Sequence, residues 1–462
     1  MPRSRRASAV KERRLAVDLP FGILLLFLLL CVVGGGSSRA DVTSLLYLQP
    51  AAIGALGFFC WRISDYGVIR PFSILLTALG LIYLVQLLPL PPAVYGQLPG
   101  RAAIETIQQF NGTASQWRSL SLDPDATLGA LLSLVFPAAM LAGLAAIRNT
   151  DRERLLVIMI LVISTSAMLG ALQVAGGHAS PFYLYRDTYP GYAVGWFANR
   201  NHQAAALACL FPLLRIWAGR GGGVIQGSTR LWLAVVIAIM VLPLIFATGS
   251  RAGLILGFLS LLASALILPP RVNLADRRAL ITLAVGLVAI VGLAFAMLAM
   301  DRAASFDRLY QSGDLGSEGR VAYLPVEWRI LAEFWPWGVG AGAFDPAIRM
   351  FEPDVLLHTT YFNHAHNDFL EMALVAGLPA IVLMTVTIAM LILWTFRAFR
   401  PYRQPGGTNA LARAGAIIIW ILVGASIVDY PLRSPLMAVI AVIAAIWLRD
   451  ARHGPDRHRE LR

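Results

Sequence analysis

The stretch HAHNDFLEMALVAG, residues 364–377, lies where a polar segment of the chain meets a long apolar run. It places two histidines, one amide and two acids at the edge of that run. Ionisable groups are costly at a membrane boundary, so a cluster of this kind indicates a functional site. The alternative is a polar rim that only anchors the following helix, and the rest of the sequence has to decide between the two.

The composition is that of a membrane protein. Of the 462 residues, 58% are hydrophobic and 14% are charged, whereas soluble domains carry about 25% charged residues. We therefore predict an all-α polytopic membrane protein. The net charge is +12, but the arginines lie in short loops between apolar runs. They indicate membrane topology, and no nucleic-acid partner is expected.

Twelve apolar runs are long enough, or nearly so, to cross about 30 Å of hydrocarbon as helices. They cover residues 19–36, 43–60, 72–90, 126–147, 154–174, 202–218, 231–248, 252–270, 278–299, 374–396, 410–428 and 434–449. The predicted organisation is a basic tail (1–18), transmembrane helices 1–9 (19–299), a large periplasmic loop (300–365), a His-Asn motif helix with transmembrane helices 10–12 (366–449) and a second basic tail (450–462).

The placement of arginine predicts the orientation. If the N-terminus is cytoplasmic, every cytoplasmic loop in this count is basic, as the positive-inside rule expects. Both termini are then cytoplasmic, and the loop 300–365 lies on the opposite, periplasmic face. Within it, residues 319–337 have apolar side chains at helical spacing, which predicts a helix on the membrane surface. The glycine cluster at 338–342 lacks the Lys-Ser/Thr of a P-loop and is interpreted as a turn.

Several arginines depart from the positive-inside pattern and share their face with most of the histidines. The arginines are Arg200, Arg251, Arg320, Arg329 and Arg433, and the histidines are His178, His202, His358, His364 and His366. An isolated arginine at the boundary can snorkel to headgroups, but several together favour a shared anion site. Guanidinium groups bind phosphate through paired hydrogen bonds, and histidine suits proton transfer. This face therefore has the residues to bind a lipid diphosphate and deprotonate a hydroxyl.

The sequence gives no reason to expect a metal. No group of His, Cys and Asp residues has the spacing of a zinc site. His364 and His366 are two residues apart, which does not place them on one face of a helix. We expect neither a metal nor another cofactor.

Taken in order, these residues resemble the O-antigen ligase superfamily of bacterial inner-membrane glycosyltransferases, which includes O-antigen polymerases. The resemblance covers about residues 195–435. The motifs that carry it are GWFANRNH (195–202), GSRAG (249–253), Gly319-Arg320 eighteen residues before GVG (338–340), His366-Asn367 followed by nine residues and Gly377, and DYPLRSP (429–435).

The resemblance implies a GT-C-like fold, in which a periplasmic loop contains surface helices, and a donor glycan on undecaprenyl diphosphate. It implies that His366 is the general base on the acceptor hydroxyl, and that Arg251 and Arg320 hold the diphosphate. Asn367 either orients His366 or caps the following helix. Further substrate-binding candidates are Arg200, Asn201, His364 and Arg433.

Three functions remain open. A ligase would transfer the glycan to a sugar hydroxyl of lipid A–core in the inner membrane, and a polymerase would extend a growing lipid-linked glycan from the same donor. A transporter of lipid-linked sugars should carry ionisable residues near the middle of its spans. Here the interiors of the spans are almost free of charge, which favours an enzyme at the membrane surface.

Overall fold

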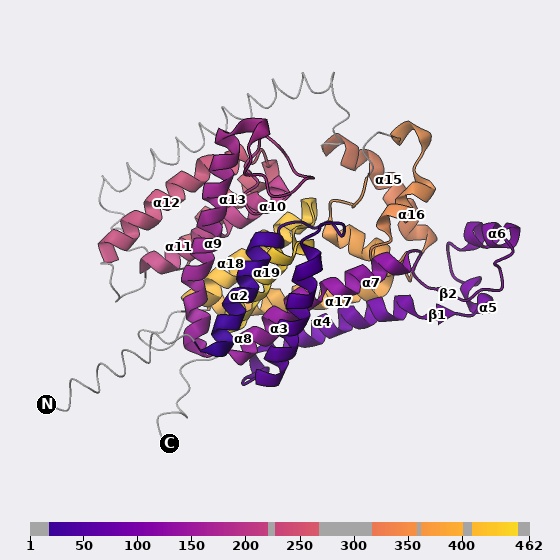
Figure 1. Cartoon of the computed structure of the whole chain (residues 1–462), viewed down its shortest axis with the longest axis horizontal. Helices are drawn as coiled ribbons and strands as arrows, with labels where there is room; N and C mark the ends of the chain where they lie inside the picture. The colour runs from indigo at the N-terminus through magenta and orange to yellow at the C-terminus, as the bar shows by residue number, and fades with distance from the viewer. Residues whose placement is uncertain (1–17, 220–226, 268–316, 358–361, 401–408, 451–462) are drawn as a thin grey trace.

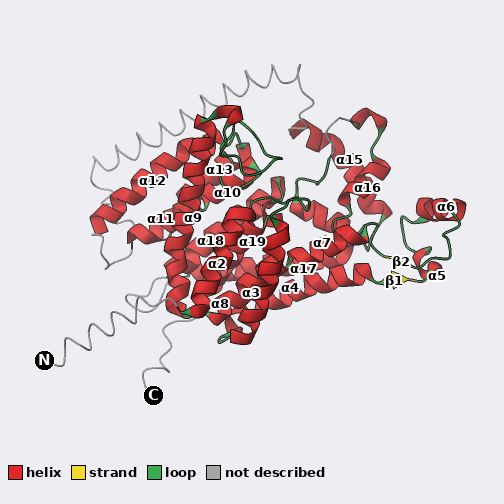
Figure 2. Cartoon of the chain, in the orientation of Figure 1, coloured by secondary structure: helices red, strands yellow, loops and turns green. Residues whose placement is uncertain are grey.

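The structure is a computed structural model, and it describes residues 18–219, 227–267, 317–357, 362–400 and 409–450. The described part is helical apart from loops and one antiparallel pair of short strands, β1 (Pro89–Leu90) and β2 (Arg118–Ser119) (Figure 2). This agrees with the predicted all-α architecture.

Among the described residues, six helical segments are long and apolar enough to cross a membrane. They are α4 (Tyr66–Leu87), the pair α7 (Pro124–Ser133) and α8 (Val135–Ala146), α9 (Asn149–Ala175), α12 (Gly227–Ala247), α17 (Asp368–Phe399) and α18 (Ala410–Val428). Shorter helices that cover other predicted runs are α2 (Leu19–Gly34), α3 (Leu45–Arg62), α10 (Arg200–Ala208), α11 (Leu210–Gly219), α13 (Arg251–Ser264) and α19 (Pro435–Arg449). The chain is thus a polytopic membrane protein. The run at 278–299 lies outside the described residues, so the count of twelve spans stays a prediction.

The remaining elements lie outside the predicted spans. They are α5 (Pro92–Tyr95), α6 (Ala102–Phe110), η1 (Gly177–Ala179), α15 (Ser317–Glu333), α16 (Phe344–Phe351), η2 (Asp354–Leu356) and η3 (Pro431–Arg433). Helix α15 occupies most of the segment 319–337, for which the sequence predicted a helix. Figure 1 shows α15 and α16 beside one another, and it shows α5 and α6 beyond the end of α4, far from the chain termini.

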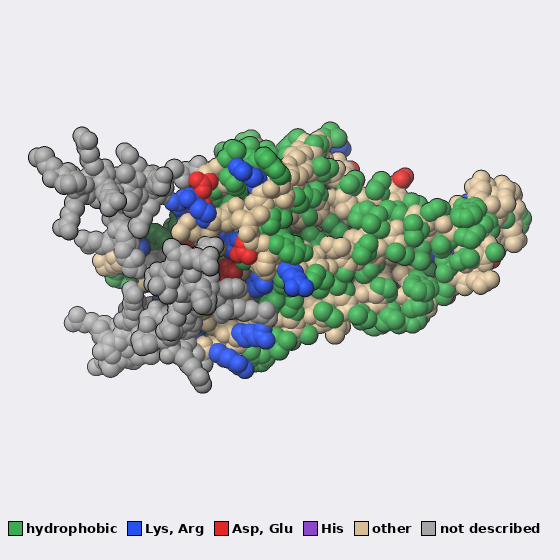
Figure 3. Space-filling model, turned by 90° about the horizontal axis from the view of Figure 1, so that it is seen from below, with side chains coloured by type: hydrophobic (Ala, Val, Ile, Leu, Met, Phe, Trp, Pro, Cys, Tyr) green, Lys and Arg blue, Asp and Glu red, His purple; other side chains and the backbone are tan. Residues whose placement is uncertain are grey.

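Two apolar clusters hold these helices together. The larger cluster joins α2, α3, α4, α8, α9, α10, α11, α12, α17, α18 and α19. The smaller one joins α15 and α16 to the first turns of α17, through residues such as Tyr323, Phe334 and Leu374. On the face shown in Figure 3, arginine side chains gather towards one end, and apolar side chains cover most of the rest. A largely apolar outer surface is what a bilayer requires of a membrane protein.

Helix α17 is broken at Gly377, which has a φ of 59° and a ψ of −145°. The break frees the carbonyls of Leu374 and Val375, which accept hydrogen bonds from the amides of Val339 (3.0 Å) and Gly340 (2.9 Å). A side chain at Gly377 would overlap the carbonyl of Pro336, so only glycine fits. The glycine cluster therefore packs against α17, and the His-Asn motif lies immediately before the short first segment of that helix.

Candidate active site

The first turn of α17 is capped by Asn367. Its Oδ1 accepts hydrogen bonds from the amides of Phe369 (3.0 Å) and Leu370 (3.1 Å). These amides have no partner within the helix, and an N-cap side chain satisfies them. Of the two roles expected for Asn367, capping is the one observed, and the side chain that contacts His366 comes from another helix.

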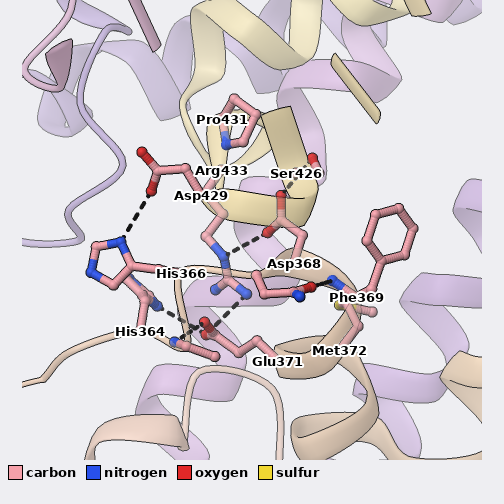
Figure 4. A network of polar contacts seen from close by, with 12 residues as sticks. His364, His366, Asp368, Phe369, Glu371, Met372, Ser426, Asp429, Pro431 and Arg433 are labelled. Carbon is pink, nitrogen blue, oxygen red and sulfur yellow. Dashed lines mark hydrogen bonds and ion pairs between the residues drawn. The ribbon is translucent and has the colours of Figure 1, made fainter. Parts of the chain in front are cut away.

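That side chain is Asp429, at the C-terminal end of α18. His366 Nδ1 lies 3.2 Å from Asp429 Oδ1 (Figure 4). The other oxygen of Asp429 accepts hydrogen bonds from the side-chain amides of Asn201 (2.6 Å) and Asn199 (3.1 Å). An ionised Asp429 places the imidazole proton on Nδ1 and leaves Nε2 as a proton acceptor. The pair therefore has the arrangement of a general base with its orienting carboxylate.

The surroundings of Asp429 keep it ionised although it is only 1% exposed. Burial by itself would raise the pKa of Asp429. The hydrogen bond from His366, the nearby imidazoles and the hydrogen bond from Asn201 outweigh that effect and hold the pKa below its ordinary value. The charge that orients His366 is thus present throughout the neutral range.

The backbone of His366 is unusual. Its φ is 50°, and within the described residues it alone has a positive φ without being glycine. Such conformations are uncommon for non-glycine residues and cluster at functional sites. The ring lies near Phe362, at a centroid distance of 5.6 Å, and near Tyr430, at 5.1 Å. The side chain is still 17% exposed, so a substrate hydroxyl can reach it.

Arg433 belongs to a second group of charges next to this pair. Its Nη2 lies 2.9 Å from Glu371 Oε1 and its Nε lies 3.3 Å from Asp368 Oδ1 (Figure 4). His364 Nδ1 also contacts Glu371 Oε1, at 2.9 Å. The positive charge of Arg433 is therefore balanced by two carboxylates of α17, and this group ties η3 to the first turn of that helix.

The motif GSRAG, residues 249–253, brings the turn that carries Arg251 to a small cavity that Asp429 also lines. Ser250 caps α13, because its Oγ accepts the hydrogen bond of the Gly253 amide at 3.0 Å. Ser250 and Ala252, which flank Arg251, line the same small cavity as Asp429. The Arg251 side chain is exposed and has no hydrogen bond or ion pair with any described residue. Its guanidinium is free to bind an anion.

Two further candidate arginines are Arg200, whose side chain the structure describes, and Arg320, whose side chain it does not. Arg200 lies over the rings of Tyr189 (5.2 Å) and Tyr192 (4.7 Å) and has no carboxylate partner within the described part of the chain. A side chain at Gly249 would meet both Arg200 and Tyr192, so Arg200 lies against the turn that carries Arg251. Arg320 is in the first turn of α15, and its side chain lies outside the described residues.

Asp429 and Asn199 were not among the predicted site residues, although both lie inside the motifs GWFANRNH and DYPLRSP. Asp429 is 63 residues from His366, so no local spacing relates them. The available signal was topological. Because α17 and α18 are consecutive predicted spans, an acid at the end of α18 is expected on the same side as the start of α17. Over the described residues, no group of three or more His, Cys, Asp or Glu side chains is arranged to hold a metal ion.

Glu327 is a buried acid on α15, near enough to Glu371 to be affected by its charge. It is 1% exposed, and its Oε1 has no hydrogen-bond partner among the described residues. Burial, together with the charge of Glu371, raises the pKa of Glu327 from 4.5 to about 8. Glu327 is therefore largely protonated at neutral pH.

This protonation predicts how stability depends on pH. The folded state keeps the proton up to about pH 8, whereas an unfolded glutamate releases it near pH 4.5, so stability should fall as the pH rises between these values. The expected loss is on the order of 3 kcal/mol between pH 5 and pH 8. Glu327→Gln should abolish this part of the decline in thermal unfolding of the purified protein. Glu333→Gln, at an exposed position of the same helix, should not, and equal slopes in all three proteins would contradict the prediction.

The O-antigen ligase family model matches residues 233–385, which include Arg251, Arg320, His366 and Gly377. Arg200, Asn201, Asp429 and Arg433 lie outside the matched segment. A comparison with curated proteins gave no match. The segment 233–385 thus matches the O-antigen ligase family, and this match confirms the resemblance that the sequence motifs indicated.

Proposed function

We propose that this protein transfers a glycan from undecaprenyl diphosphate to a sugar hydroxyl of lipid A–core. The observation that carries the proposal is the His366–Asp429 pair, with its 3.2 Å contact, beside a turn whose arginine has no partner among the described residues. A base next to a free cation suits a reaction in which a hydroxyl loses its proton while a phosphate departs with negative charge. The family match supports the same class of enzyme, a ligase- or polymerase-like glycosyltransferase.

The reaction proceeds as a single displacement. His366 Nε2 accepts the proton of the acceptor hydroxyl, and its oxygen forms a bond to the anomeric carbon of the donor sugar. The bond between that carbon and the diphosphate oxygen breaks, and undecaprenyl diphosphate leaves with the electron pair. Asp429 stabilises the imidazolium that forms, and the anomeric configuration is inverted.

Arginines at the turn before α13 bind the leaving group. Arg251 and Arg200 supply positive charge that no described carboxylate neutralises, and Arg320 is a further candidate on α15. The N-terminus of α13 adds the partial positive charge of its backbone amides. Together these groups stabilise the diphosphate as its charge grows, so the step needs no metal.

The distribution of arginines supports an orientation of the protein in the bacterial inner membrane. With both termini in the cytoplasm, the basic loops face the cytoplasm and the His366 site faces the periplasm of the inner membrane. The donor glycan and the lipid A–core acceptor then meet the site from the outer leaflet.

The test is a deletion of the gene in the source organism, with the envelope glycolipids separated on a gel. Loss of long glycan from lipid A–core, with long chains retained on the lipid carrier, supports the ligase. A core that carries a single repeat unit identifies the polymerase, which uses the same donor. An unchanged glycolipid pattern rejects both.

Arg251→Ala should lower kcat/KM of the purified protein by about 10²- to 10³-fold, because it removes a positive charge that stabilises the departing diphosphate. Arg251→Lys should recover only part of the activity, because an ammonium group cannot form the paired hydrogen bonds of a guanidinium group. The assay is glycan transfer from a lipid-linked donor in nanodiscs. The matched control is Arg349→Ala, whose arginine is exposed on α16 and pairs with Asp345. Equal activity of the Arg251 and Arg349 variants would argue against a role for Arg251 in donor binding.

A further inference from the structure

His202 is a buried histidine to which the proposed mechanism assigns no task. It lies in the first turn of α10 and is 0% exposed. Neither ring nitrogen has a hydrogen-bond partner among the described residues. The ring packs edge-on between Phe197, at a centroid distance of 6.3 Å, and Tyr430, at 5.7 Å. A buried polar group normally finds a partner, either in the protein or in an ordered water.

A small cavity next to His202 offers such a partner. It is lined by His202, Asn201, Ser250 and Asp429, together with apolar side chains of α13 and α18. It leaves about 10 Å³ for the centre of a water molecule, which is about the space that one water needs. The four polar side chains among its lining residues can supply the two to four hydrogen-bond partners that a buried water needs.

The hydrogen-bonding capacity of these groups fits one water. The Ser250 hydroxyl accepts the bond from the Gly253 amide (3.0 Å), and its own proton is not used by any described residue. Asp429 already accepts bonds from Asn199 and Asn201 and contacts His366, and a carboxylate has room for a further donor. The His202 imidazole can either donate to the water or accept from it.

We propose that a single bound water in this cavity joins His202 to Asp429 and Ser250, which makes His202 a positioning residue for the Asp429 carboxylate. Through Asp429 it fixes the orientation of His366, and through Ser250 it links this pair to the turn that carries Arg251. The catalytic part of this inference rests on the proposed transferase function, whereas the water site itself does not.

The first test is kinetic and uses the full-length protein in nanodiscs. His202→Phe keeps a ring between Phe197 and Tyr430 but removes both nitrogens. It should lower kcat about 10-fold or more, because small displacements of a catalytic group are costly, while KM for the donor stays unchanged. His202→Gln retains a polar group and should recover part of kcat. The control Phe197→Leu alters packing on the other side of the ring and should change kcat by no more than about twofold.

The pH profile separates positioning from packing. Without the water, Asp429 accepts one hydrogen bond fewer, so it stabilises the protonated form of His366 more strongly. The acid limb of the pH–rate profile of His202→Phe should therefore move to higher pH. The other ionisable groups around the pair stay the same in this variant, and they are His364, Asp368, Glu371, Tyr430 and Arg433. A His202→Phe protein with the kcat and the pH profile of the wild type overturns the inference.

The second test does not depend on activity. A cryo-EM map of the wild-type protein that resolves ordered waters should show one density peak within hydrogen-bond distance of His202 and Asp429. A cavity without that peak overturns the inference even if His202→Phe is slow or fails to accumulate. If the peak is present but the wild-type protein transfers no glycan, the water site stands and the proposed function fails.

Discussion

Replacing His366 by glycine should lower the rate of glycan transfer by about 10²- to 10⁴-fold, which is the usual contribution of a general base. Without the imidazole, the acceptor hydroxyl has to lose its proton to bulk water. Glycine suits this position because the backbone φ of 50° is unstrained for glycine, so the variant is expected to fold. The measurement is kcat for transfer from a lipid-linked donor, together with binding of that donor, which should change little.

Chemical rescue separates the loss of a base from damage to packing. The His366 ring is 17% exposed, so added imidazole can enter the space that glycine leaves. Imidazole should restore part of the activity of His366→Gly, with a pH dependence set by the added base. An inactive variant that binds donor normally but does not respond to imidazole or other small bases would count against His366 as the base.

Asp429→Asn tests the other half of the pair in the same assay. An amide offers no negative charge to the imidazolium, and it can hold the ring in the wrong tautomer. We expect a loss of kcat smaller than that of His366→Gly. Because the two residues act as a unit, the double variant should be no slower than His366→Gly alone. Losses that multiply in the double variant would mean that Asp429 acts independently of His366.

Much of the fold could be predicted from the sequence, because the length and hydropathy of an apolar run identify a membrane helix. The eleven predicted apolar runs that fall within the described part of the chain contain helices, and the helix expected over 319–337 is α15. An apolar run does not show where a helix is interrupted. Helix α17 continues through Pro379 but departs from helical geometry at Gly377. That break depends on hydrogen bonds with residues 336–340, which only the folded chain brings close.

The sequence predicted which residues form the site better than it predicted which of them contact one another. The sequence identified His366 and the unusual arginines, because ionisable groups are conspicuous against apolar runs. It could not show that α17 and α18 pack together and bring Asp429 to His366. Nor could it distinguish Arg251, which has no partner in the described part of the chain, from Arg433, which faces two carboxylates. Whether an arginine is free for a substrate is a property of its neighbours in space.

The pairing of Arg433 leads to a prediction about stability. Arg433→Ala would leave the carboxylates of Glu371, which is 0% exposed, and Asp368 without their guanidinium partner. Removing one member of a buried ion pair costs about 3–5 kcal/mol, because the remaining charge is poorly solvated. We expect a lower unfolding temperature and a reduced yield of monodisperse protein in detergent. Arg349→Ala is the matched control, because its exposed pair with Asp345 contributes about 0–1 kcal/mol.

A compensating change decides between the two roles open to Arg433. If Arg433 serves to neutralise α17, Arg433→Ala combined with Glu371→Gln should regain much of the lost stability, because the deepest unpaired charge is removed. If Arg433 instead binds the donor diphosphate, Arg433→Ala should fold like the wild type and lose affinity for the donor, and the second substitution should restore nothing. Since the guanidinium lies 2.9 Å from Glu371 and 3.3 Å from Asp368, we expect the first result. The diphosphate would then depend on the arginines that have no such partners, Arg251 and Arg200.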